Sequence, residues 1–95
     1  MPAYIIVELE VTDPVAFEEY RKQVPATIAQ YGGRYVVRGG ATETLEGGWN
    51  PKRLVVLEFA SMDQAKRWYN SEAYRAPKAL RFTAATSKAI LVEGA

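Results

Sequence analysis

Three charged residues at strand-like spacing are the first candidates for chemistry in this sequence. Glu8 and Glu58 lie in two apolar segments, and Arg38 ends a third. If they share a buried face of a sheet, their charges must be paired. A desolvated glutamate could then accept a proton while the arginine holds an anion or a carbonyl group. The interpretation that we weigh more heavily is an ion network that only fixes an interface.

Two adjacent aromatic residues, Trp68 and Tyr69, are the second group of candidates. They could form the wall of a site for a planar ligand, with Asn70 as an amide donor, although core packing is the favoured interpretation. The chain has six tyrosines, and each buried hydroxyl needs a partner, which is consistent with a polar-lined pocket. Trp49 is expected to be exposed or to contact a second copy rather than to stack on a ligand.

The composition excludes several kinds of chemistry. The 95 residues contain no cysteine and no histidine, which removes disulfides, thiolate nucleophiles, Cys/His zinc sites, imidazole-ligated haem and histidine-based triads. Nearby arginines argue against an oxygen-ligated metal at Glu8 and Glu58. None of the three Gly-Gly pairs completes a phosphate-loop or dinucleotide fingerprint. We therefore expect neither a metal nor a bound cofactor.

Charge and hydropathy narrow the range of partners. The net charge is +1 and the charged residues are scattered, which disfavours nucleic acid and anionic membranes. The apolar stretch over residues 3–11 is too short to span a bilayer, and it lacks the basic region and cleavage site of a signal peptide. We expect a cytoplasmic protein with neither a nucleic-acid nor a membrane partner.

Apolar periodicity predicts the elements that position these residues. Residues 4–11 have an apolar residue at every odd position, as in a strand with one core face. Asp13 can accept hydrogen bonds from the free amides of a helix start, and Pro14 suits the first helical position. The apolar stripe that follows ends at a Gly-Gly pair, and Pro25 inside it predicts a kink or two abutting segments.

The middle of the chain predicts a hairpin. Residues 34–38 alternate in polarity, and the Gly-Gly pair after them predicts a bulge or bend before pairing continues through residues 41–46. Residues 47–51 have the composition of a loop, and residues 53–59 return as a third strand.

The last third of the chain predicts helical segments and a final strand. Ser61 and Gln64 match a capping box that begins a helix. Ser71 is expected to cap a further helical piece that is interrupted near Pro77. Residues 88–92 then form the fourth strand.

The order β-α-β-β-α-β, with two right-handed βαβ halves joined by a hairpin, is that of ferredoxin-like folds. It predicts one α+β domain over residues 1–95, in which a four-stranded antiparallel sheet of order 4-1-3-2 has both helices on one face. The opposite face is expected to carry the apolar residues Tyr4, Ile6, Leu54, Val56, Ile90 and Val92, and the charged residues Glu8, Glu10, Arg34, Arg38, Glu58 and Lys88. So large an apolar surface predicts a homodimer packed sheet to sheet.

Four segments in this order resemble the domain of unknown function 1330 family. They are Arg34-Tyr35-Val36-Val37-Arg38-Gly39-Gly40, Leu45-Glu46-Gly47, Val56-Leu57-Glu58-Phe59, and Trp68-Tyr69-x-Ser71-x-x-Tyr74. The resemblance extends over nearly the whole chain. It implies a ferredoxin-like dimeric α/β barrel in a small, cytoplasmic protein, and it implies no established activity. The wider superfamily includes cofactor-free monooxygenases, lactone isomerases and haem-dependent peroxidases, but similarity at that level is fold analogy.

Two functions from different classes are consistent with the sequence. One is a homodimeric barrel that binds a small organic molecule through Arg38, Glu8, Glu58, Trp68 and Tyr69, with activity of the cofactor-free monooxygenase or isomerase type. The other is a non-catalytic, stress-related or interaction protein whose charges only hold the dimer together. The first predicts a cavity with aromatic walls in which Arg38 and a carboxylate are accessible, whereas the second predicts charges that satisfy one another with no room left.

Overall fold

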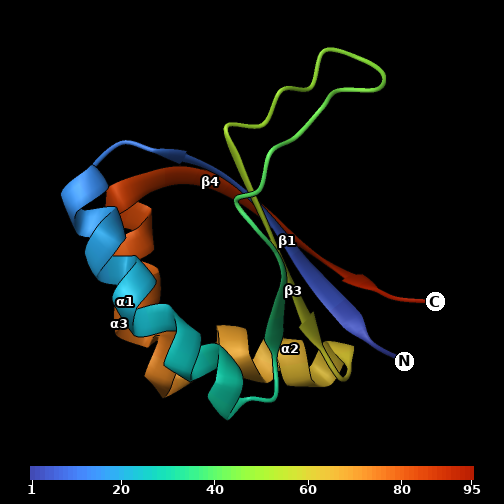
Figure 1. The fold of residues 1–95 in the computed structure, drawn as a ribbon. Coiled ribbons are helices and arrows are strands. Elements are labelled where there is room, and N and C mark those ends of the chain that lie inside the picture. The colour runs from blue at the N-terminus through green and yellow to red at the C-terminus, as the bar shows by residue number, and fades with distance from the viewer.

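The computed structural model describes residues 1–95 and contains four strands and three helices (Figure 1). In chain order these are β1 (Ala3–Val11), α1 (Pro14–Gln30), β2 (Arg34–Arg38), β3 (Arg53–Phe59), α2 (Met62–Tyr69), α3 (Glu72–Ala84) and β4 (Ala85–Glu93). All neighbouring strands pair antiparallel in the order β2-β3-β1-β4. This confirms the predicted 4-1-3-2 order, read from the opposite edge.

The sheet is curved, and all three helices lie on its concave side (Figure 1). The alternation of side chains along the central strand β1 explains why the helices cover this face. Its odd residues Ile5, Val7 and Leu9 are buried, whereas Glu8 is only partly buried. Helices α1 and α3 pack against each other, and α2 lies closer to the two chain ends (Figure 1). Side chains on the concave face of the sheet therefore pack with side chains of all three helices to form the core.

Each helix begins at a side-chain cap. Asp13 accepts a hydrogen bond from the amide of Ala16, and Ser61 accepts one from the amide of Gln64, both at 3.1 Å. The Gln64 side chain does not close the predicted capping box. It donates to the carbonyl of Tyr31 at 2.9 Å and so ties the end of α1 to the start of α2.

Two prolines lie inside helices that continue past them. Pro25 lies within α1 and Pro77 within α3, and each helix is a single element. The predicted interruption near Pro77 and the alternative of two abutting segments at Pro25 are therefore wrong. Each proline removes one backbone hydrogen bond, but the packing of α1 on α3 and the burial of Pro77 hold the helices together.

Strand β2 differs from the prediction in where its pairing ends and where its bulge lies. Tyr35 pairs with Leu57, but Val37 pairs with Val56, so the register shifts between Tyr35 and Val37. No strand is present in residues 39–52, which project beyond the sheet as a long loop (Figure 1). Gly39 begins this departure at a φ of 71°. The predicted pairing through residues 41–46 is therefore wrong.

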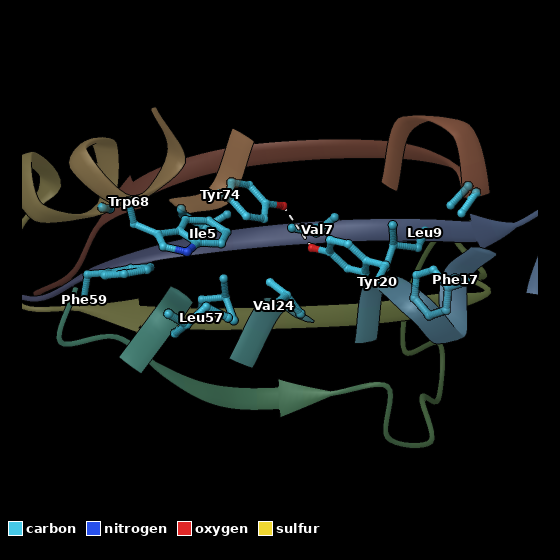
Figure 2. Packing of buried hydrophobic residues seen from close by; sticks show 14 residues of the cluster. Ile5, Val7, Leu9, Phe17, Tyr20, Val24, Leu57, Phe59, Trp68 and Tyr74 are labelled. Atoms are coloured by element: carbon cyan, nitrogen blue, oxygen red, sulfur yellow. Dashed lines mark hydrogen bonds between the residues drawn. The ribbon is translucent and has the colours of Figure 1, made fainter. Parts of the chain in front are cut away.

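Aromatic residues from three elements form the centre of the core (Figure 2). The ring of Trp68 stacks on that of Tyr74 at a centroid distance of 4.0 Å and lies 5.5 Å from that of Phe59. The indole N–H of Trp68 donates to Thr27 Oγ1 at 3.0 Å, and that hydroxyl donates to the carbonyl of Val24 at 2.7 Å. The one polar group of Trp68 is thus satisfied inside the core.

We predict that Thr27→Val lowers the free energy of unfolding by about 1 to 3 kcal/mol, because it leaves the buried indole N–H without an acceptor. Urea unfolding measures the change. Thr83→Val is the matched control, since Thr83 is exposed and its hydroxyl contacts only the carbonyl of its own helix, at Ala79. Equal losses in the two variants would contradict the role assigned to Thr27.

Candidate functional site

A cavity lies between the concave face of the sheet and the three helices. It offers about 40 Å³ to the centres of water molecules, which is room for a few waters or for a small organic molecule. Of its 18 lining residues, 14 are hydrophobic or aromatic. The other four are Arg21, Arg38, Arg53 and Arg81, and no aspartate or glutamate lines the cavity.

The register of the sheet directs two of these arginines inward. Arg53 pairs with Leu9, whose side chain is buried on the concave face. Arg38 pairs with Val55, which lines the cavity, because the shift between Tyr35 and Val37 moves the end of β2 to the concave face. The guanidinium carbon of Arg38 lies 4.3 Å from the centroid of the Tyr35 ring, within cation–π distance.

Gly39 makes room for the Arg53 guanidinium. A Cβ at this position would lie 2.6 Å from Arg53 Cζ, closer than carbon atoms pack. The positive φ of Gly39 also suits a residue without a side chain. The end of β2 therefore positions Arg53 as well as Arg38.

Three of these arginines, Arg21, Arg38 and Arg53, are close enough for their charges to interact, and no carboxylate lines the cavity with them. Burial, followed by the positive charges of Arg21 and Arg38, lowers the pKa of Arg53 from its ordinary value. A guanidinium remains protonated at neutral pH despite such a shift, so the cluster carries concentrated positive charge. The Nε atoms of Arg53 and Arg81 are buried without a hydrogen-bond partner.

Two tyrosine hydroxyls meet in the cavity wall. Tyr20 and Tyr74 approach to 2.9 Å between their hydroxyl oxygens, next to Val7 (Figure 2). Burial is the main cause that raises the pKa of both phenols. Near them, Arg81 is 3% exposed and donates from Nη1 to Ser87 Oγ at 2.8 Å. This part of the wall combines neutral hydroxyls with a deeply buried cation.

The predicted group of Arg38, Glu8 and Glu58 is not brought together. Both glutamates lie on the convex face, where Glu58 pairs with Arg34 in the register and Glu8 pairs with Lys88. Arg38 lies on the concave face instead, because the bulge reverses the alternation after Tyr35. The placement of these three side chains on one face is therefore wrong.

Arg34 takes the position expected for Arg38. Its Nε donates to Glu58 Oε1 at 2.7 Å, and the hydroxyl of Tyr4 donates to Glu58 Oε2 at 2.9 Å. These two hydrogen bonds lower the pKa of Glu58, and the bond from Tyr4 has the larger effect. Glu58 is thus a satisfied carboxylate rather than a free base, while Glu8 forms no ion pair within the protomer.

Trp68 and Tyr69 both line the cavity, so core packing and a ligand wall are compatible roles for them. Trp68 is 2% exposed, and Tyr69 is partly buried with the Lys78 ammonium 4.2 Å from its ring centroid. Asn70 ends α2 and does not line this cavity. Trp49, in the long loop, is 57% exposed. This agrees with the prediction that Trp49 is exposed or contacts a second copy.

The sequence contains a signal for some of the cavity residues that the prediction omitted. Arg53 precedes Val55, Leu57 and Phe59 at alternate positions, which assigns it to the same face of β3. Arg81 follows Tyr74 and Pro77 at helical spacing on the buried side of α3. No comparable pattern indicates that Arg21 approaches Arg53, since that proximity joins distant segments.

The strand order and the helices on one side of the sheet define a ferredoxin-like α+β protein. The chain belongs to the family described as Domain of unknown function (DUF1330), whose model matches residues 2–95. This confirms the family resemblance of the sequence. No curated protein matches the chain.

Solved structures with the same fold share little sequence with this chain. A protein of unknown function from Rhodopseudomonas palustris is 18% identical with a TM-score of 0.76, and the match covers 99% of this chain and 82% of that one. A dimeric ferredoxin-like protein of unknown function from Jannaschia sp. CCS1 is 11% identical with a TM-score of 0.72, covering 99% and 100%. SnoaB, a cofactor-independent oxygenase from Streptomyces nogalater, is 15% identical with a TM-score of 0.64, covering 99% and 93%.

Two further structural findings concern metals and membranes. No group of three or more aspartates and glutamates is close enough to hold a metal ion. No helix has the length and apolar character that crossing a bilayer requires.

We predict that the phenols of Tyr20 and Tyr74 stay protonated in the folded protein above the ordinary tyrosine pKa of about 10, because burial raises the pKa of both. Because both pKa values are raised by folding, their contribution to stability is complete below about pH 10 and is lost as the pH rises above it. Absorbance at 295 nm follows ionisation, and urea unfolding between pH 8 and 11 follows stability. The double variant Tyr20→Phe/Tyr74→Phe should lose less stability with rising pH. Ionisation of both phenols near pH 10 without unfolding would contradict the prediction.

Proposed function

We propose that this protein binds a small organic molecule in the cavity between its helices and its sheet. The observation that carries the proposal is the composition of the cavity wall, in which aromatic rings and apolar side chains surround four arginines. Binding sites for small molecules combine such an apolar wall with a few polar groups that fix orientation. Trp68 and Tyr69 supply part of the wall, and Arg38 lies at its exposed edge.

Activity of the cofactor-free type, if it accompanies binding, rests on arginines and tyrosines rather than on the two glutamates. Glu8 and Glu58 lie on the opposite face of the sheet from this cavity. The groups at the cavity wall are guanidinium groups, which stabilise developing negative charge, and the hydroxyl pair of Tyr20 and Tyr74, in which one hydroxyl donates to the other and the second keeps its own donor free. The oxygenase SnoaB shares the fold, and this likeness supports the general kind of protein and no particular reaction.

The convex face supports self-association. Ile90 and Val92 are 63% and 42% exposed there, beside the partly buried Ile6 and Val56. Two neighbours of the same fold are described as dimeric. We propose that a second copy packs against this face and forms the dimeric α/β barrel. The ion pair of Arg34 with Glu58 would then stabilise the interface, which is the structural role considered for the charged residues.

We predict that Ile90→Glu shifts the protein from dimer to monomer, because it places a charge beside Ile6 on the apolar face. Analytical ultracentrifugation across a range of protein concentrations measures the shift. Val15→Glu, at an 82% exposed position on α1, is the matched control and should remain dimeric. A wild-type protein that is monomeric at all concentrations would refute the proposed interface.

The cavity itself is tested by nuclear magnetic resonance of ¹⁵N-labelled protein. The probes are a panel of alcohols, amides and carboxylates with up to four carbon atoms at millimolar concentration. We expect at least one probe to shift, saturably, amides beside the cavity such as those of Val7 and Leu57. Val55→Phe, which fills the cavity, should abolish these shifts, whereas Val15→Phe at the exposed surface should not. The proposal fails if no probe shifts the cavity amides, or if the shifts persist in Val55→Phe.

A further inference from the structure

Four arginines line the cavity, and no acidic side chain lines it with them. Arg53 is close enough to Arg21 and Arg38 for their charges to oppose its own. The cavity wall offers them no acidic residue, and the one carboxylate paired with any of them is Glu18, which contacts Arg21 on the exposed surface of α1 at 3.3 Å. Positive charges gathered at an apolar wall without an acidic partner favour the binding of an anion there.

Two hydrogen-bond donors at this cavity also lack acceptors. The Nε atoms of Arg53 and Arg81 are buried and make no hydrogen bond, although the rest of the Arg81 side chain is anchored by Ser87. Buried donors in folded proteins are almost always satisfied, and an unsatisfied one points to a missing ion, water or ligand. Because guanidinium donors form a planar fork, the groups that match them are carboxylates and phosphates.

The size and the wall of the cavity limit the rest of the ligand. The available 40 Å³ is well below the roughly 150 Å³ of an engineered apolar cavity that binds benzene. Rings of Trp68, Tyr69 and Tyr74 and aliphatic side chains surround this space. A short apolar chain of a few carbon atoms can contact these apolar side chains. Inorganic phosphate has no apolar part and could not make such contacts.

We propose that the cavity is selective for a small organic carboxylate. The carboxylate group binds the guanidinium of Arg53, with Arg38 at the exposed edge, and the short carbon chain lies against the aromatic wall. This assignment rests on the proposed function, because it requires that the cavity bind an organic molecule, and it adds the chemical class of that molecule.

The arrangement predicts opposite effects of Arg53 on stability and on binding. Arg53→Met keeps the aliphatic stem but removes the charge and the unsatisfied donor. Without ligand, this variant should therefore resist urea at least as well as the wild type. Its affinity for a carboxylate should fall by about tenfold or more, because a charge-assisted pair is lost. A purely structural arginine would instead be needed for stability.

Three probes at constant ionic strength test the selectivity by titration of the ¹⁵N-labelled protein. Butyrate is the carboxylate, butyramide is its neutral counterpart of the same shape, and inorganic phosphate is an anion without an apolar chain. We expect butyrate to shift the cavity amides with an affinity at least tenfold above that of butyramide and above that of phosphate. Arg53→Met, and Arg38→Met at the exposed edge, should lose this preference. Arg67→Met is the matched control, since Arg67 pairs with Asp63 on the outer surface of α2.

The outcomes separate this inference from the proposed function. If butyramide binds as well as butyrate, or if phosphate binds more tightly, the carboxylate assignment is overturned while cavity binding stands. Unchanged butyrate affinity in both Arg53→Met and Arg38→Met would overturn the role of the arginines. If neither these probes nor the wider panel shift the cavity amides, the proposed function fails together with the inference.

Discussion

The extra residue in β2 is the constraint on which the chemistry of both sheet faces depends. Between Tyr35 and Val37 the pairing with β3 shifts by one position. Since side chains alternate between faces, a shift of one residue moves every later side chain to the other side. Arg34, before the shift, stays on the convex face with Glu58, and Arg38, after it, lies at the cavity. Gly39, whose amide still donates to the carbonyl of Leu54, then leaves the space that the Arg53 guanidinium occupies.

Charged side chains on the two faces of the sheet are consequently compensated to different degrees. On the convex face, Glu58 accepts hydrogen bonds from both Tyr4 and Arg34, so its charge is compensated within one protomer. On the concave face, the charge of Arg53 is opposed by neighbouring arginines and its Nε has no partner. Compensated charges suit an interface whose register they help to define, and uncompensated charges suit a site whose partner arrives from solution. The proposed interface and the proposed ligand site therefore lie on different faces of the sheet.

The cavity shares its wall with the core. Trp68 packs between Phe59 and Tyr74 and also lines the cavity, and its indole N–H is held by Thr27 of α1. Tyr74 joins α3 to α1 through its hydroxyl contact with Tyr20 (Figure 2). A wall built from such packed residues has little freedom to rearrange, which would preorganise the proposed site for a small ligand. It also means that substitutions in the aromatic wall test stability and binding together, whereas the arginines allow the two to be separated.

The sequence by itself determined the sheet order, the burial of the odd positions of β1 and the helix starts at Asp13, Ser61 and Ser71. The sheet order follows from the order of the elements and the right-handed connections between parallel strands. The other features depend on local spacing and on side chains that act within one turn or one strand. Only the tertiary structure decided which arginine meets Glu58 and which arginines gather at the cavity. The bulge depends on how β2 meets β3 rather than on the alternation of β2 itself, and the approach of Arg21 to Arg53 joins segments more than thirty residues apart. Contacts of this kind leave no periodic signal in the sequence, because they arise only when packed elements bring distant positions together.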